Sequence, residues 1–312
     1  MDNTNYVIRA KESSGVTITG NNIVAYLPLK DVDYDTRTGM DMDLAVVIGV
    51  EYCDEFQITY NDIKANVSTV DGDYPTLDTI IVLDSCDAYI GHNNVTEIDD
   101  VTQPGSANYL YAIDVYRCDD LTIEYNNIEL VSSGGTFIEG TDNGTSTAYG
   151  IQLTGGYEGV VISHNNITTS NNGPNAGIYS QNFGGDTQLS ITDNIIHVEG
   201  NASFHSWSLV TGMELQDNDV YVARNVITVI NKCPYNIGDN AYGISFSQYG
   251  NANPTFEITN NTVDVVNGMY AVYIQYSDYS YVTYNCLNTT YYTGNFAVFD
   301  NGNMDIIGNY GP

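Results

Sequence analysis

The stretch "DVYRCDD", residues 114–120, holds the side chains best suited to chemistry in this sequence. It places three carboxylates, those of Asp114, Asp119 and Asp120, around the guanidinium of Arg117. Carboxylates beside an arginine can move a proton and neutralise the charge of a polysaccharide substrate. If the protein is an enzyme, a polysaccharide lyase or a glycoside hydrolase, we expect these four residues to be the catalytic ones.

A glycoside hydrolase also needs two carboxyl groups about 5 to 9.5 Å apart. On the strand register derived below, Asp114 and Glu214 lie three coils apart, about 14 Å at about 4.8 Å per coil. That separation is too large for such a pair. The outward positions of the first strand in successive coils are expected to be Asp114, Gln152, Tyr179, Glu214 and Ser245. The spacing therefore favours a protein without catalytic activity and leaves an enzyme as the alternative.

The loop "KDVDYDTRTGMDMD", residues 30–43, is the best candidate for a metal site. Alternating aspartates favour calcium, which takes six to eight oxygen ligands. The glycine position and the missing closing glutamate do not match a helix-loop-helix calcium loop, so a solvated acidic loop is the alternative. The candidate calcium ligands are Asp31, Asp33, Asp35, Asp41 and Asp43. No other cofactor is expected.

Two further residue types are distributed unevenly. Cys53, Cys86 and Cys118 lie at similar places in successive repeats, which predicts a stack of thiols with one disulfide as an alternative.

The 27 tyrosines are frequent near the C-terminus. Tyrosine is enriched in binding surfaces and is also a good strand former. We expect a binding surface that includes Tyr273, Tyr276 and Tyr281, with a structural role as the alternative.

A repeated phrase indicates what positions these groups. "ISHNNI", residues 162–167, recurs as apolar-x-x-Asn-x-apolar at intervals of 24 to 40 residues. Periods of this size are typical of repeat architectures. We expect each first asparagine to lie at a bend and to bond its counterpart in the next repeat, as a ladder of buried amides. The ladder residues are Asn21, Asn61, Asn93, Asn126, Asn165, Asn194, Asn225, Asn261 and Asn285.

Each repeat consists of three short segments rich in β-branched residues, with apolar residues in period two. Examples are "YGIQLT" before the asparagine, residues 149–154, and "IHVE" after it, residues 196–199. Helical spacing is not sustained anywhere. The sequence therefore predicts an all-β fold, a right-handed parallel β-helix with three short strands per coil and about ten coils. Such solenoids stack each coil on its neighbours.

The "I-x-x-N-x-I" coils preceded by "A-x-G-I-x-L" segments resemble the repeats of the pectate-lyase-like β-helix superfamily. The richness in Asn, Thr, Tyr and Asp is similar to that of adhesin-like surface proteins of methanogenic archaea. The first resemblance implies a parallel β-helix, in a superfamily that includes lyases, glycoside hydrolases, phage tailspikes and adhesins. Fold alone does not choose among them. The polygalacturonase motifs "NTD", "GHG" and "RIK" are absent.

Charge limits the partners. The 312 residues carry a net charge of −31 with only eight basic residues. Nucleic acids and anionic membranes bind through Lys and Arg, so neither is an expected partner. No signal peptide and no apolar stretch long enough for direct membrane insertion is present.

We interpret residues 1–312 as a single β-helix domain, with neighbouring domains of a longer extracellular, cell-surface protein as further partners. The expected function is adhesin-like, binding a glycan or a protein on another cell. A carbohydrate-active enzyme and a purely structural stalk are the alternatives.

Overall fold

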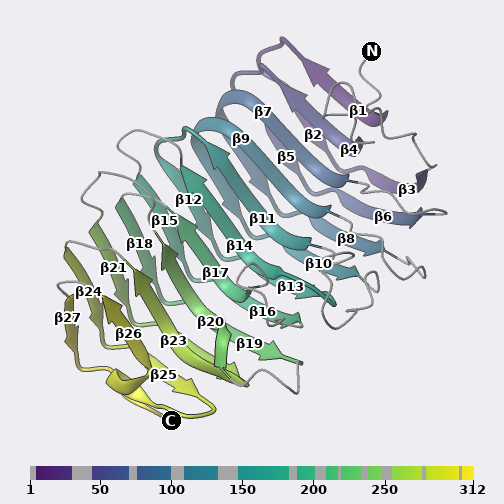
Figure 1. The fold of residues 1–312 in the computed structure, drawn as a ribbon. Coiled ribbons are helices and arrows are strands. Elements are labelled where there is room, and N and C mark those ends of the chain that lie inside the picture. Colours follow the sequence, from purple (N-terminus) through teal and green to yellow (C-terminus); the bar gives the residue numbers. More distant parts are fainter. Residues whose placement is uncertain are drawn as a thin grey trace, which may run out of the picture.

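A computed structural model describes most of the chain. The described residues are 5–29, 44–69, 76–99, 109–132, 147–182, 188–200, 209–216, 219–232, 238–247, 255–275, 279–301 and 304–312. They form a parallel β-helix, as predicted, in which strands from successive coils stack in rows along a rod (Figure 1). The N- and C-terminal coils lie at opposite ends of this rod.

The coils have three sides. The first sheet, all parallel, contains β1 (Asn5–Lys11), β4 (Leu44–Glu51), β7 (Thr76–Gly91), β9 (Tyr109–Glu124), β11 (Thr147–Gly155), β14 (Asn175–Asn182), β17 (Val210–Gln216), β20 (Gly238–Ser247), β23 (Gly268–Gln275) and β26 (Val298–Asn301). The second contains β2 (Thr17–Thr19), β5 (Gln57–Thr59), the distal parts of β7 and β9, β12 (Val160–Ser163), β15 (Gln188–Thr192), β18 (Asp219–Ala223), β21 (Thr255–Thr259), β24 (Tyr279–Thr283) and β27 (Met304–Ile307).

The third sheet is separate from these two and is also parallel. It contains β3 (Asn22–Leu29), β6 (Asp62–Thr69), β8 (Asn94–Asp99), β10 (Asn127–Ser132), β13 (Asn166–Ser170), β16 (Ile195–Gly200), β19 (Val226–Asn231), β22 (Thr262–Val266) and β25 (Cys286–Thr289). A short 3-10 helix, Gly294–Ala297, follows β25. Within the described residues, no helix has the length and apolar composition that crossing a membrane requires.

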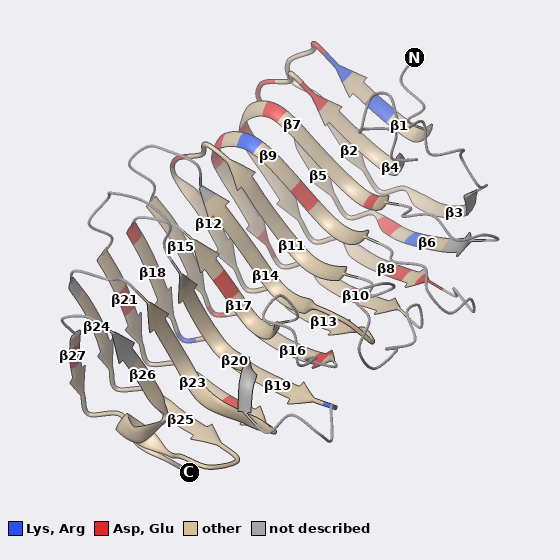
Figure 2. Cartoon of the chain, viewed as in Figure 1, with Lys and Arg blue, Asp and Glu red and all other residues tan. Residues whose placement is uncertain are grey.

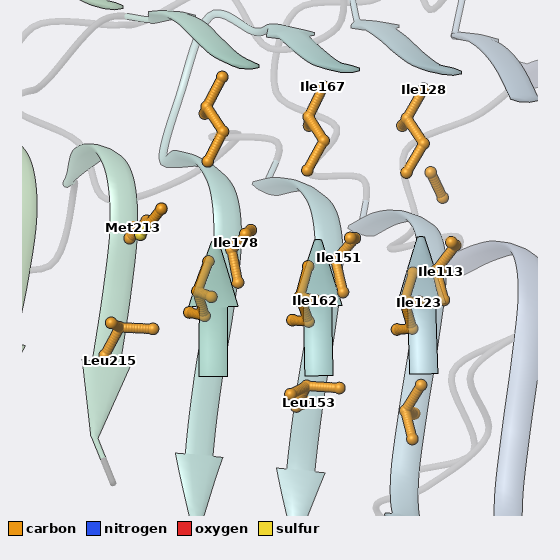
Figure 3. Packing of buried hydrophobic residues seen from close by; sticks show 14 of the residues in the cluster. Ile113, Ile123, Ile128, Ile151, Leu153, Ile162, Ile167, Ile178, Met213 and Leu215 are labelled. Carbon is orange, nitrogen blue, oxygen red and sulfur yellow. The ribbon is translucent and has the colours of Figure 1, made fainter. Parts of the chain in front are cut away.

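The core consists of rows of like side chains, one per coil. Ile113, Ile151, Ile178 and Met213 occupy one register position of the first sheet, and all are fully buried. Figure 3 shows this row facing the isoleucines of the other two sheets. Burying one such side chain stabilises the fold by about 1.5–3 kcal/mol, which explains the apolar residues in period two.

A glycine in the first strand permits close approach of the first and third sheets. A Cβ added at Gly212 would lie 2.3 Å from Cγ2 of Ile227 and 2.5 Å from the carbonyl oxygen of Gly243. Gly177 and Gly243 occupy the same place in adjacent coils. The glycine of the "A-x-G-I-x-L" segments is therefore a packing requirement.

The asparagine ladder is present along the described coils. The backbone N–H and the side-chain Nδ2 of Asn126 both donate to Oδ1 of Asn165, each at 3.0 Å. Nδ2 of Asn126 also donates to the carbonyl oxygen of Ile90, at 2.9 Å. Because the same bonds recur in each coil, the buried amides are satisfied from both sides. The series runs through all nine predicted asparagines to Asn309 and ends on Asn295.

The residue before each ladder asparagine adopts a left-handed conformation, with φ of 56° at Tyr60 and 57° at His92. Because these residues occupy equivalent places, their rings stack: centroids are 4.8 Å apart for Tyr60 and His92, and 5.0 Å for His92 and Tyr125. His164 continues the stack beyond Tyr125 at 4.8 Å.

The expected cysteine stack is wrong by one residue. Cys86 pairs with Asp54 and Asp119 on either side, so Ser85 is the residue between Cys53 and Cys118. The reason is a shorter spacing, because Cys86 lies seven residues before its ladder asparagine whereas Cys53 and Cys118 lie eight before theirs. All three thiols are free.

Candidate functional site

The four residues proposed for catalysis do not form one cluster. Asp114 lies on the outward face of the first sheet, in β9, whereas Arg117 and Asp120 lie at the bend to the second sheet, with φ of 53° and 52°. Nε of Arg117 contacts Oδ1 of Asp84 at 3.0 Å. Oδ1 of Asp119 accepts the backbone N–H of Glu158 at 2.8 Å. Arg117 and Asp119 thus bond to neighbouring coils at the bend, Asp120 lies beside them there, and only Asp114 faces outward from the first sheet.

Asp114 belongs to a row of polar and aromatic residues. Asp114, Gln152, Tyr179 and Glu214 occupy one outward register position on successive strands β9, β11, β14 and β17, and Ser245 follows on β20. These are the outward positions predicted from the sequence. A neighbouring row contains Gln181 and Gln216. We call this surface the tyrosine–amide face, made of Asp114, Gln152, Tyr179, Gln181, Glu214 and Gln216; all six are half-buried.

Hydrogen bonds order the side chains of the tyrosine–amide face. Nε2 of Gln152 donates to Oδ1 of Asp114 at 3.0 Å, and the hydroxyl of Tyr179 donates to Oε1 of Gln181 at 3.1 Å. Nε2 of Gln181 donates to Oε1 of Gln216 at 2.9 Å. The ring of Tyr149 stacks on that of Tyr179, with centroids 4.7 Å apart and planes 2° apart. Planar groups are thereby held in fixed orientations at the coil spacing.

Both carboxylates of this face have a raised pKa. Burial raises the pKa of Asp114 to about 6, against the opposing effect of the Gln152 hydrogen bond. Burial raises the pKa of Glu214 to about 7, again opposed by a glutamine, Gln216. Near neutral pH, Glu214 is therefore present both as a carboxylic acid, which donates a hydrogen bond, and as a carboxylate, which accepts one.

An acidic residue that interacts with Asp114 is more deeply buried. Asp78, on β7, is only 2% exposed. Its pKa is raised well above the usual range by burial and by the charges of Asp114 and Glu97. Glu214 has Tyr179 and Ser245 as its neighbours in the row, so a second carboxylate does not flank it there. Asp114 therefore has an acidic neighbour, whereas the neighbours of Glu214 in the row, Tyr179 and Ser245, are not acidic.

The tyrosines predicted to bind are divided between two sheets. Tyr273 lies on the first sheet, where its ring stacks between Tyr242, at 4.5 Å, and Phe299, at 4.7 Å. Tyr281 lies on the second sheet and is 44% exposed. Tyr276 lies outside the described residues. The structure therefore does not bring Tyr273 and Tyr281 onto one face.

The candidate calcium ligands Asp31, Asp33, Asp35, Asp41 and Asp43 lie outside the described residues. Within the described ranges, no group of three or more His, Cys, Asp or Glu side chains has the geometry to hold a metal ion. Acidic residues are nevertheless prominent: Figure 2 shows red on β9 and β17, and the sequences of β11, β14 and β17 contain no Lys or Arg.

Stacked parallel coils with an internal amide ladder define the protein as a parallel β-helix solenoid. No family model matches the chain, and no curated protein matches it. Among solved structures it is similar to the Dettilon tailspike protein, at 13% identity and a TM-score of 0.37, over 88% of this chain and 62% of the tailspike chain. The chain thus spans less than two thirds of that protein's length. Membership of the pectate-lyase-like superfamily and kinship with archaeal adhesins remain predictions.

Proposed function

We propose that this β-helix is extracellular, exposed at a cell surface, and binds neutral glycans on another cell without cleaving them. The tyrosine–amide face carries this proposal. Its amides, hydroxyl and carboxyls are ordered by the bonds from Gln152 to Asp114 and from Gln181 to Gln216. Groups held in place lose little conformational freedom on binding, which favours affinity.

The charge of this face selects among glycans. The strands that form it carry Asp114 and Glu214 but, on β11, β14 and β17, no basic residue. A uronic acid polymer would meet like charge there, which disfavours binding. A neutral sugar offers vicinal hydroxyl groups that both donate and accept, matching glutamine amides and the two protonation states of Glu214.

Binding to an array of neutral and acidic glycans, with released products followed by mass, tests the proposal. We expect capture of neutral glycans without cleavage products. Gln181→Ala and Gln216→Ala should each weaken capture by about threefold to tenfold, the effect of one lost hydrogen bond. Thr228→Ala, on the outward face of β19 in the third sheet, is the matched control and should bind as the wild type does.

Two results would contradict the proposal: cleavage of a captured glycan, or binding that both glutamine variants leave unchanged. A preference for proteins over glycans would equally exclude it. Repeating the capture in a chelator tests the separate prediction that the loop containing Asp33 and Asp41 binds calcium. Loss of capture in the chelator would show that binding depends on a metal ion, as that prediction expects.

A further inference from the structure

A groove lies on a different side of the coils from the tyrosine–amide face. A groove of about 480 Å³ crosses β12, β15, β18 and β21 on the outward face of the second sheet. The first and last of these strands are three steps apart, about 14 Å. The volume lies within the usual range of about 300–1,000 Å³ for ligand sites. We call it the second-sheet groove; Val161, Gln188, Ser190, Asp219, Tyr221 and Glu257 are among the residues that line it.

The lining of the second-sheet groove combines a ring with two carboxylates. Tyr221 pairs in register with Ser190 on one side and Glu257 on the other. Asp219 lies two residues before Tyr221 on β18, so its Cα is about 8 Å from that of Glu257. Asp219 and Glu257 are exposed, and Tyr221 is half-buried between them.

The negative charge of the groove is not neutralised from within. None of its described lining residues is Lys or Arg. The nearest cation in the sequence, Arg224, donates to both oxygens of Asp193 at 2.8 and 2.7 Å, and it also hydrogen-bonds to Tyr221. Because the guanidinium pairs with Asp193 and not with Asp219 or Glu257, these two carboxylates remain available to an external cation.

We propose that the second-sheet groove binds a short saccharide chain carrying free amino groups. Its ammonium groups pair with Asp219 and Glu257, and a sugar ring lies against Tyr221. Gln188 and Ser190 bond the hydroxyl groups. This site is separate from the tyrosine–amide face and selects cationic rather than neutral sugars, and it stands whether or not that face binds neutral glycans.

The strand pairing favours a saccharide over a basic peptide. β12, β15, β18 and β21 are each hydrogen-bonded to a strand on both sides. No strand edge is free there for an extended peptide to add to, so its backbone amides would lack their usual partners. A sugar chain has no such amide ladder to satisfy and bonds through hydroxyl groups to side chains.

Calorimetric titration with a glucosamine tetramer, its fully N-acetylated counterpart and tetralysine tests this proposal at pH 6 and two salt concentrations. We expect the glucosamine tetramer to bind at least tenfold more tightly than either other probe, and less tightly in high salt. Asp219→Asn and Glu257→Gln should each weaken it about tenfold, as loss of a charge-assisted hydrogen bond does. Glu129→Gln, an exposed carboxylate on β10, removes the same charge elsewhere and should bind as the wild type does.

Equal binding of tetralysine would show general cation attraction and overturn the proposal. So would undiminished binding by both groove variants, or an absence of binding by the glucosamine tetramer. Gln216→Ala separates the two sites. It should weaken neutral glycan capture and leave glucosamine binding unchanged, so failure of one proposal is distinguishable from failure of the other.

Discussion

The carboxyl of Glu97 lies inside the coil, where it links protein stability to pH. It is 0% exposed, and Thr79, also fully buried, donates a 2.8 Å hydrogen bond to its Oε2. Oε1 has no hydrogen-bond partner. Burial raises the pKa of Glu97 from 4.5 to about 8, with the Thr79 bond opposing and the charge of Asp99 adding to the effect. At neutral pH this side chain is therefore mainly a protonated acid.

The sign of the pH effect follows from the raised pKa. The folded protein keeps the proton between pH 4.5 and about 8, whereas the unfolded chain releases it. The stabilisation is therefore complete below pH 4.5 and is lost as pH rises through about 8. Raising the pH from 5 to 8 therefore lowers the free energy of unfolding by about 3.5 kcal/mol through this single group.

Glu97→Gln tests this reasoning because a carboxamide is a neutral analogue of the protonated acid. We expect the variant to lie within about 1 kcal/mol of wild type at pH 5 and to be about 3 kcal/mol more stable at pH 8. The assay is urea unfolding at several pH values. Glu129→Gln, an exposed residue on the adjacent strand β10, controls for loss of one charge from a protein of net charge −31. A constant difference between wild type and Glu97→Gln at every pH would refute a buried, titrating Glu97.

Three further predictions concern the packing of the coils. Asn165→Ala leaves buried partners unbonded in the coils on both sides and should lower the free energy of unfolding by about 3–5 kcal/mol, measured by urea denaturation. Gly212→Ala forces a methyl group against Cγ2 of the neighbouring isoleucine and should cost about 1–3 kcal/mol in the same assay, where an unchanged midpoint would argue against close contact. Under oxidising conditions Cys53 and Cys118 should not form a disulfide, because Ser85 lies between them and they are two coil steps, about 9.6 Å, apart. Mass spectrometry of peptides after alkylation would detect a disulfide-linked pair, which would contradict this prediction.

The repeat itself was predictable because it is local and periodic. Every ladder position, such as Asn126 or Asn225, follows from a six-residue phrase whose physical cause lies within one bend. The outward row from Asp114 to Glu214 also followed, because alternation in period two fixes the face on which a side chain lies. The predicted register of the cysteines was wrong because a shift of one residue at a bend is hard to detect in a sequence with loops of variable length.

The buried acids were not predicted. Glu97 lies in "VTEID", where alternation places it at an inward position, and that signal alone could have identified it. Acidic residues rarely lie inward, so alternation by itself is a weak signal for a buried carboxyl. The second-sheet groove depends on four strands that are separated by variable connections. Neither Asp219 nor Glu257 belongs to a recognisable motif, and only the stacking of the coils brings them together.

The asparagine ladder also keeps the spacing between coils independent of the number of residues in each coil. Successive ladder residues are 24 to 40 positions apart in the sequence, yet the hydrogen bonds between their side-chain amides stay at 2.9–3.0 Å. Insertions between strands therefore lengthen the chain without lengthening the rod. Duplication of a whole coil would instead move everything beyond it by one fixed increment. Within each proposed binding face, neighbouring residues of a row are thus one coil step apart, and sequence drift in the connections leaves that spacing unchanged.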